Sequence, residues 1–205
     1  MRQPVTWGPP VTERADAARN RRLLLATARD MLAEQGAARL TMDGLAERAG
    51  LGKGTVFRRF GTRAGIFHAL LDDEERDFQQ RVLAGPPPLG PGAPALDRLI
   101  AYGRARTDFL VANREIARGA LDGREQEPAG WQTPMSREHI RFLLTETDLG
   151  GADLDVLATQ LTAALDGPPL LYLSAALLTD DAPRLTERLG RGWEDLVRRV
   201  CASGG

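Results

Sequence analysis

Small residues and cations are interleaved over a short stretch in the first third of the sequence. The run Gly52-Lys53-Gly54-Thr55 offers two glycines, an ammonium group and a hydroxyl, and guanidinium groups follow at positions 58, 59 and 63. Glycines let a backbone approach a partner closely, while cations and hydroxyls contact phosphate oxygens and base edges. These residue types at this spacing fit a helix that enters the major groove of DNA.

The same stretch has an apolar edge that would hold such a helix in place. Val56 and Phe60 are four residues apart, so they share one face of a helix and are expected to pack on Leu45 and Ala49 as core residues. The residues that face away from this core are then Gly54, Thr55 and Arg58. One apolar and one polar edge are what a groove-reading helix requires.

Capping signals divide the surrounding region into four helices, expected over residues 13–35, 42–49, 52–60 and 63–84. Gly36 is placed to end the first helix in the left-handed conformation, and Gly50 closes the second. Thr41 and Thr62 stand as N-caps of the second and fourth. Two short helices joined by a glycine turn behind a longer helix predict a helix-turn-helix unit.

Charge is distributed unevenly along the chain. The net charge of −1 comes from 27 basic and 28 acidic residues, but residues 1–68 carry +6 and residues 69–205 carry −7. A cationic segment attached to an anionic remainder suits a module that faces a polyanion. Among the basic residues only Lys53 is a lysine.

Several classes of protein are disfavoured by composition. A single cysteine, Cys201, cannot form an internal disulfide, which fits a reducing cytoplasm, and no apolar run approaches the roughly 20 residues that span a bilayer. The first ten residues lack the apolar core of a signal peptide. Two histidines and one cysteine leave little for a metal site, and the nucleotide-loop, zinc-protease and Ser/His/Asp patterns of common enzymes are missing. We therefore expect no metal, no cofactor and no enzymatic activity.

Residues 40–67, LTMDGLAERAGLGKGTVFRRFGTRAGIF, resemble the DNA-binding motif of the TetR family, and the resemblance extends back to about Arg21. The remainder resembles the family in helical layout and length, and is similar to the SbtR-like group of C-terminal domains. The resemblance implies an all-α fold in three parts. These are a flexible arm over residues 1–11, a helix-turn-helix DNA-binding domain over 12–62, and a larger helical domain for ligand binding and dimerisation over 63–205.

Matching the motif position by position implies a set of DNA-binding residues. Lys53 and Gly54 match residues that reach bases. Those that match phosphate-holding positions are Thr41, Thr55, Phe57, Arg59 and Arg63. With Gly52 and Arg58, whose places on the helix were argued above, the expected interface is Thr41, Gly52, Lys53, Gly54, Thr55, Phe57, Arg58, Arg59 and Arg63.

The motif departs from the family's usual residues at three of these positions. Phe57 stands where tyrosine is usual, so a hydroxyl–phosphate hydrogen bond is missing. Gly52 stands where serine is usual, which weakens the helix cap. Arg59 stands where histidine or tyrosine is common and offers a stronger phosphate partner.

Simpler interpretations of these residues stay open. The cations could form a solvated helix face, and Lys53 could be exposed without contacting a base. The arm at residues 1–11 could contact a minor groove through Arg2 and Trp7, although plain disorder is the simpler expectation.

Beyond a Gly- and Pro-rich linker at residues 83–94, the pattern predicts helices over 95–112, 114–122, 134–147, 153–178 and 184–202. The sequence Gly167-Pro168-Pro169 should kink or split the fourth of these. Aromatic and polar residues that could line a ligand pocket are Tyr102, Arg106, Phe109, Trp131, His139, Phe142 and Tyr172. Ordinary core packing is the favoured alternative for the aromatic residues. Arg106 and His139 stand out in apolar helices, but partial exposure of His139 is favoured over ligand contact.

The last two helices resemble the family's dimerisation pair. Their apolar residues are Leu154, Leu157, Leu161, Leu165, Leu185, Leu189, Trp193, Leu196 and Val200. A four-helix interface between two copies would bury this surface, and packing within one subunit is the alternative.

The resemblance implies a ligand-responsive transcriptional regulator, and a repressor is the favoured form. It would bind a palindromic double-stranded DNA operator as a cytoplasmic homodimer and be released by a small-molecule effector of unknown identity, without a membrane partner. The alternatives are a helix-turn-helix regulator that acts through protein contacts and an enzyme with a DNA-addressing domain.

Overall fold

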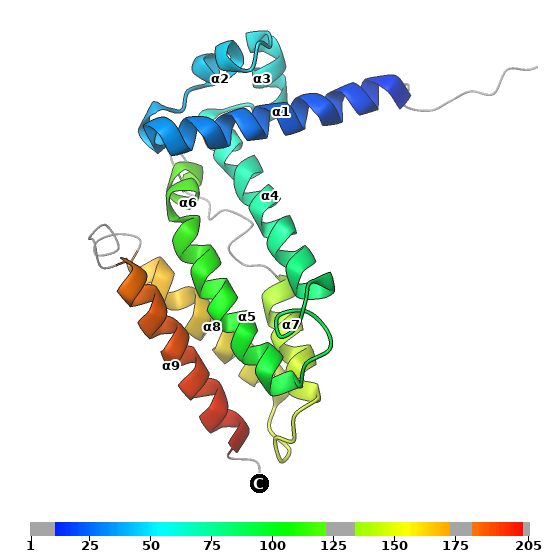
Figure 1. Cartoon of the computed structure of the whole chain (residues 1–205), viewed down its shortest axis with the longest axis vertical. Coiled ribbons are helices and arrows are strands. Elements are labelled where there is room, and N and C mark those ends of the chain that lie inside the picture. The colour runs from blue at the N-terminus through cyan, green and yellow to red at the C-terminus, as the bar shows by residue number, and fades with distance from the viewer. Residues whose placement is uncertain (1–10, 122–133, 173–181, 203–205) are drawn as a thin grey trace, which may run out of the picture. The chain divides into compact units, whose positions relative to one another are not determined.

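The computed structural model describes residues 11–121, 134–172 and 182–202, and every regular element in these ranges is a helix (Figure 1). The all-α fold expected from the sequence is therefore confirmed. The chain divides into two compact units, Met1–Leu70 and Leu71–Gly205. This division falls inside one helix, α4, whereas the DNA-binding domain expected from the sequence ends at residue 62, just before that helix.

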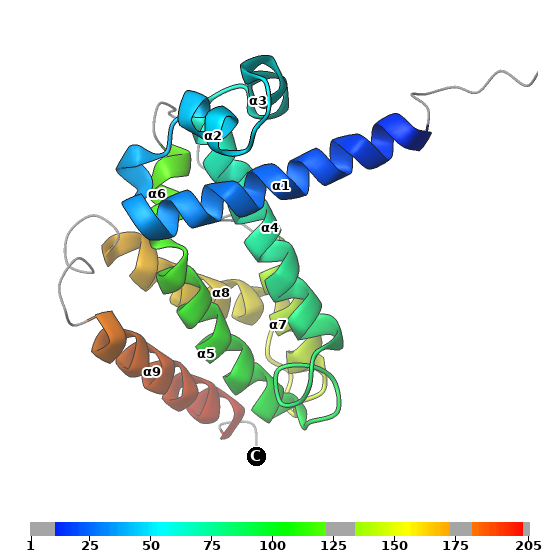
Figure 2. The ribbon, with the colours of Figure 1, turned by 45° about the horizontal axis from the view of Figure 1, so that its top comes forward.

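The first unit contains α1 (Val11–Gln35), the short 3₁₀ helix η1 (Ala37–Arg39), α2 (Met42–Arg48), α3 (Lys53–Phe60) and the start of α4 (Arg63–Ala84). Figure 2 shows α2 and α3 side by side as the two short helices of the unit. The fully buried side chains that hold it together are Leu24, Ala28, Leu45, Val56, Ile66, Phe67 and Leu70. Because α2 has only seven residues, these tertiary contacts and not its own hydrogen bonds keep it folded.

The turn between α2 and α3 follows from Gly50. This residue has φ 65°, and its N–H donates to the carbonyl of Glu47 while the N–H of Leu51 donates to that of Ala46. Together these bonds form a Schellman motif, which needs a residue in the left-handed region. The predicted N-cap at Thr41 is confirmed, since its Oγ accepts from the N–H of Gly44 at 3.0 Å.

The two remaining capping predictions differ in outcome. Thr62 caps α4, with its Oγ accepting from the N–H of Gly65 at 3.1 Å. Gly36 does have a positive φ of 76°, but its ψ of 168° lies outside the left-handed helical region. The chain therefore leaves α1 in an extended direction that only glycine adopts easily, and it turns into η1.

The second unit contains the rest of α4 with α5 (Ala95–Ala112), α6 (Arg114–Leu121), α7 (Pro134–Thr145), α8 (Leu154–Tyr172) and α9 (Ala182–Ala202). Helix α5 is central, packing against α7, α8 and α9. Gly103 of α5 lies directly under Trp193 of α9, whose indole N–H donates to the carbonyl of Leu99 at 3.0 Å. A side chain at position 103 would collide with that ring.

Helix α8 is not split at Gly167-Pro168-Pro169, because it continues to Tyr172. Proline keeps a helical φ, and its cost is the loss of hydrogen bonds to carbonyls one turn earlier, which this helix tolerates. None of the helices in the described ranges has the length and apolarity to cross a membrane.

Candidate nucleic-acid interface and effector region

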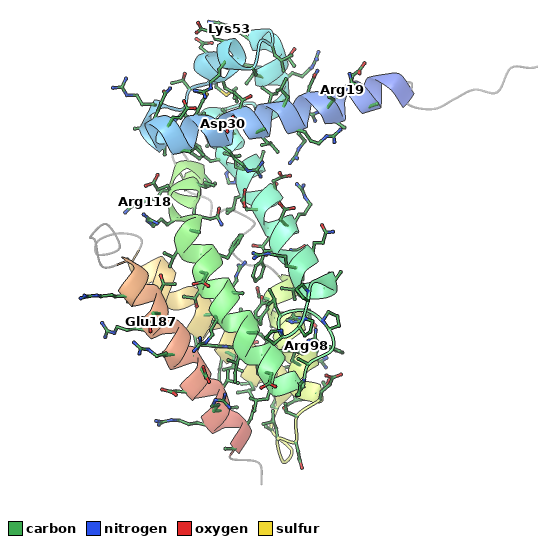
Figure 3. All side chains as sticks on the ribbon, viewed as in Figure 1. Arg19, Asp30, Lys53, Arg98, Arg118 and Glu187 are labelled. Atoms are coloured by element: carbon green, nitrogen blue, oxygen red, sulfur yellow. The ribbon has the colours of Figure 1, made fainter. Side chains whose placement is uncertain are left out.

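Helix α3 has one buried and one exposed face, as its sequence predicts. Val56 is fully buried and Phe60 is 9% exposed, so both belong to the core of the first unit. Lys53, Gly54 and Arg58 are exposed, and Figure 3 shows Lys53 at the outer end of the α2–α3 pair. Phe57 is 50% exposed, an unusual state for so large an apolar side chain. The helix therefore presents an aromatic ring and two cations outward.

The glycines of this helix are not required by packing inside the protein. A Cβ added at Gly52 or at Gly54 would meet no atom within 4 Å. Gly52 has φ −63°, which any residue adopts, and it caps the helix without a side-chain hydrogen bond. The backbone at the start of α3 is thus left open toward the outside, as close approach to a ligand requires.

The four cations of the expected interface differ in whether they are bonded to other groups of the protein. Within the described part of the chain, Arg58 has no ion-pair or hydrogen-bond partner. Lys53 pairs with Asp43 of α2 at 3.0 Å, and both side chains are more than 60% exposed. Exposed pairs of this kind contribute about 0–1 kcal/mol, so the ammonium can readily exchange partners.

Arg59 and Arg63 are instead bound to backbone carbonyls. The guanidinium of Arg59 donates to the carbonyl of Ala17 in α1 at 2.7 Å. That of Arg63 donates to the carbonyls of Leu40 at 2.8 Å and Ala37 at 2.6 Å. It also lies 4.8 Å from the ring centroid of Phe67. Residue type alone suggested two outward-facing phosphate ligands, but both side chains also join helices.

Helices α1 and α3 enclose a groove on the same side as these cations. Its volume is about 260 Å³, and its lining residues are Ala17, Asn20, Leu24, Thr55, Arg58 and Arg59. Thr55 is half-buried there, and Thr41 lies exposed at the start of α2 with its Oγ engaged in the helix cap. Of the expected interface residues, the structure thus brings Thr55, Arg58 and Arg59 together around this groove.

The second unit contains a buried ionic network around Arg106. This side chain is 1% exposed, and its Nη1 donates to Glu75 at 2.7 Å, while Asp166 lies 3.7 Å from its Nε. The rings of Phe78 and Phe109 flank the guanidinium, with centroids at 5.6 Å and 5.0 Å. Burial raises the pKa of Asp166, and the nearby Arg106 opposes this shift.

Beside this network, Tyr102 and His139 pack on each other with ring centroids 4.9 Å apart. The hydroxyl of Tyr102 donates to the Oγ of Ser136 at 2.7 Å, and burial raises the pKa of Tyr102 to about 12. Burial, followed by the charge of Arg98, lowers the pKa of His139 to about 4. Both groups are therefore neutral near pH 7.

Some residues proposed for a ligand pocket are elsewhere than expected. His139 is 7% exposed, so the expectation of partial exposure was wrong: it lies on the face of α7 that packs on α5. Phe142 is 49% exposed, because it lies outside the buried stripe of α7, and it does not line the interior. Trp131 and the side chain of Tyr172 lie outside the described residues.

Glu75, Asp166 and Ser136 were not identified from the sequence. Glu75 stands in the apolar stripe formed by Leu71, Phe78 and Val82, and a carboxylate in such a stripe is a signal for a buried partner. The cavity beside Arg106 and Glu75 is small, about 10 Å³, and accommodates roughly one water molecule.

The expected dimerisation residues fall into two groups. Leu161, Leu165 and Trp193 are 3–4% exposed, so packing within the subunit already covers them. The side chains left wholly or partly accessible are Leu154, Leu157, Leu185, Leu189, Leu196 and Val200. Between α8 and α9 lies an open groove of about 230 Å³ that includes Leu189 and Leu196. No cluster of potential metal ligands occurs among the residues that the structure describes.

Comparison with known proteins agrees with this arrangement. A family model described as bacterial regulatory proteins, tetR family, matches residues 24–70, which contain the C-terminal half of α1, all of α2 and α3, and the start of α4. It ends before the C-terminal helices, so the SbtR-like assignment stays a prediction. No curated protein matches the sequence.

Solved structures share the fold over nearly the whole chain. A TetR-family transcriptional regulator from Pectobacterium atrosepticum has a TM-score of 0.67 at 22% identity, covering 92% of this chain and 97% of that one. A putative TetR-family regulator from Rhodococcus sp. has a TM-score of 0.59 at 18% identity, covering 90% and 99%. A TetR variant from Acinetobacter baumannii in complex with minocycline has a TM-score of 0.58 at 19% identity, covering 89% and 96%.

Residues 24–70 therefore carry the DNA-binding domain of the tetR family of bacterial regulatory proteins, and the chain shares its fold with solved TetR-family regulators over nearly its whole length.

Proposed function

We propose that the protein is a cytoplasmic repressor that binds a palindromic operator as a homodimer and leaves it when a small molecule binds the C-terminal domain. The observation that carries this proposal is the outer face of α3. There Phe57 is half exposed, Arg58 is unpaired among the described residues, and the glycine backbone is open. An apolar ring and an unpaired cation on an exposed helix are explained by a partner that covers them.

In this proposal Gly52–Phe60 enters a major groove. Lys53 exchanges Asp43 for a base edge and Gly54 lets the backbone approach, while Thr41, Thr55 and Arg58 contact phosphates. Phe57 contacts a sugar or a thymine methyl group. Arg59 reaches a phosphate by leaving the Ala17 carbonyl, whereas Arg63 contributes mainly by fixing the start of α4 against η1.

The accessible apolar residues of α8 and α9 support a homodimer. They form a surface that a second copy of the same two helices would cover in a four-helix arrangement. A two-fold dimer then presents its two α3 helices to half-sites about 34–36 Å apart, or a multiple of that spacing.

Effector release requires that a ligand bind one dimer geometry more tightly than the other, with a coupling of about 1–3 kcal/mol. The buried polar groups around Arg106 and His139 support a ligand region in the second unit. Helix α4 is continuous from Arg63 to Ala84, so it links both units covalently. The minocycline complex of the Acinetobacter baumannii TetR variant is an example of a ligand bound by this fold.

DNase footprinting on the DNA upstream of the protein's own gene tests the proposal. Protection of a palindrome, together with reduced transcription from that promoter in vitro, is the expected result. Protection with increased transcription would favour a regulator that acts through contacts with polymerase. If no DNA segment is protected and a substrate is turned over, the enzyme alternative replaces this proposal.

A further inference from the structure

Arg98 is a buried cation that lacks the carboxylate its neighbour Arg106 has. It lies in the first turn of α5, is 8% exposed, and its Nε atom is buried without a hydrogen-bond partner (Figure 3). No carboxylate among the described residues pairs with it. Arg106, two turns further along α5, is instead paired with Glu75.

Polar groups on α7 face the same part of α5. Ser136 and His139 lie one turn apart on α7, are 3% and 7% exposed, and face Tyr102, which follows Arg98 by one turn. The Nε2 atom of His139 is buried without a partner. The Oγ of Ser136 accepts from Tyr102, so its own hydrogen is available to donate.

These groups form a donor set without an acceptor. A buried polar nitrogen without a hydrogen-bond partner costs free energy, and Arg98 Nε and His139 Nε2 are two such atoms. We propose that Arg98, His139 and Ser136 bind an oxyanion, the carboxylate or phosphate group of a small molecule. The guanidinium, the imidazole N–H and the hydroxyl would each donate to one of its oxygens.

The ionisation of His139 is consistent with this arrangement. With its pKa lowered to about 4, the imidazole is neutral at pH 7, and its Nε2 can carry the hydrogen that is donated. Among the described residues Arg98 is the charged group that acts on this pKa. An anion bound between the two would offset that charge and raise the pKa.

NMR titration of the two histidines, in protein without DNA, tests the proposal. Sodium phosphate and sodium acetate are added separately, with sodium chloride holding the ionic strength constant, and His68 serves as internal reference. A saturable rise of the His139 pKa by about one unit or more is expected with at least one of the two anions, with no matching change at His68. The more effective anion tells whether the site prefers phosphate or carboxylate.

Three variants attribute the response to Arg98. Arg98→Met, and Arg98→Gln should the first not fold, remove the cation, so the response of His139 to both anions is lost. Arg104→Gln is the matched control, because Arg104 is on the same helix but exposed and paired with Glu194, and it keeps the response. Without anion, Arg98→Met should leave the melting temperature unchanged or raise it, since it removes an uncompensated charge.

Two results would overturn the proposal. One is a His139 pKa that neither anion changes, or that changes equally in the Arg98 variants. The other is a melting temperature of Arg98→Met that falls by several degrees without anion, which would mean that a group of the protein itself already pairs with Arg98. Neither measurement depends on operator binding, so the regulatory role and the anion site can fail separately.

Discussion

Arg58 in the first unit and Arg106 in the second are both arginines on helices, and their surroundings differ completely. Arg58 is exposed and has no partner in the described part of the chain, whereas Arg106 is 1% exposed and bonded to Glu75 between two phenylalanine rings. A solvent-exposed cation can form an ion pair with a phosphate at little cost in free energy. A buried cation is instead held in place by the groups that neutralise its charge. Arg58 is therefore available to an external partner, whereas the charge of Arg106 must stay neutralised within the protein.

The largest expected effect on stability comes from removing the carboxylate that neutralises the buried Arg106. Glu75→Ala leaves Arg106 buried with only the more distant Asp166, and we expect the free energy of unfolding to fall by about 3–5 kcal/mol. Urea denaturation followed by circular dichroism measures it. Glu194→Ala is the matched control, since it removes a partly exposed carboxylate that pairs with Arg104 and Arg198 near the surface and should have a far smaller effect. If both variants lose the same free energy of unfolding, the buried pair contributes no more to stability than the pair near the surface.

The second prediction concerns the pH dependence of stability. The folded state keeps His139 neutral down to about pH 4, whereas the unfolded chain takes up a proton near pH 6.5. The unfolded state therefore binds more protons between these values, and stability is lost as the pH falls, by up to about 3 kcal/mol. Denaturation of wild type and His139→Asn at pH 7 and pH 5 measures the difference.

The wild type should lose more stability than the variant over this interval. Comparing the two proteins removes the contribution of Asp166, whose raised pKa acts in the opposite direction. Parallel pH profiles would mean that the imidazole is not held neutral by its surroundings.

The surface is tested by removing its most accessible cation. Arg58→Ala should weaken binding to all DNA sequences alike and reduce the slope of log affinity against log salt by about 0.9, the value for one phosphate contact. Fluorescence anisotropy between 50 and 200 mM salt, roughly the range over which such slopes are measured, gives both quantities. Arg104→Ala in the second unit should leave the slope unchanged. A slope that Arg58→Ala does not alter removes Arg58 from the interface.

A smaller and more selective effect is expected at Lys53. Lys53→Ala should lower affinity for the operator more than affinity for random DNA, by about 1–3 kcal/mol of discrimination if the ammonium reaches a base. Competition binding with operator and random duplexes measures the ratio. The same loss on both duplexes would mean that Lys53 acts only through its charge.

The first unit was largely predictable because its determinants are local. Thr41 and Thr62 cap helices within three residues of themselves, Gly50 has the φ that its turn needs, and Val56 and Phe60 share a face by their spacing. What local patterns could not indicate is that Arg59 and Arg63 bond to carbonyls of Ala17, Ala37 and Leu40. These contacts exist only once the helices have packed.

The second unit was predictable in its helices but not in its contacts. Glu75 and Arg106 are far apart in the sequence and meet only through the packing of α4 on α5. On α7 the buried stripe of Ile140, Leu143 and Leu144 includes His139 and leaves Phe142 outside, so residue type was a poorer guide than the position on the helix. The sequence of one chain likewise does not indicate which accessible leucines contact a second copy, because that depends on the surface of the second copy.

The central claim, that the outer face of α3 is where DNA binds, is tested most directly at Gly54. A methyl group added there meets no atom of the protein, and alanine favours a helix by up to about 1 kcal/mol over glycine. Gly54→Ala should therefore keep or raise the melting temperature while weakening operator binding by about tenfold or more, as one lost close contact of roughly 1.4 kcal/mol implies. Unchanged operator affinity in a stably folded Gly54→Ala protein would contradict the account.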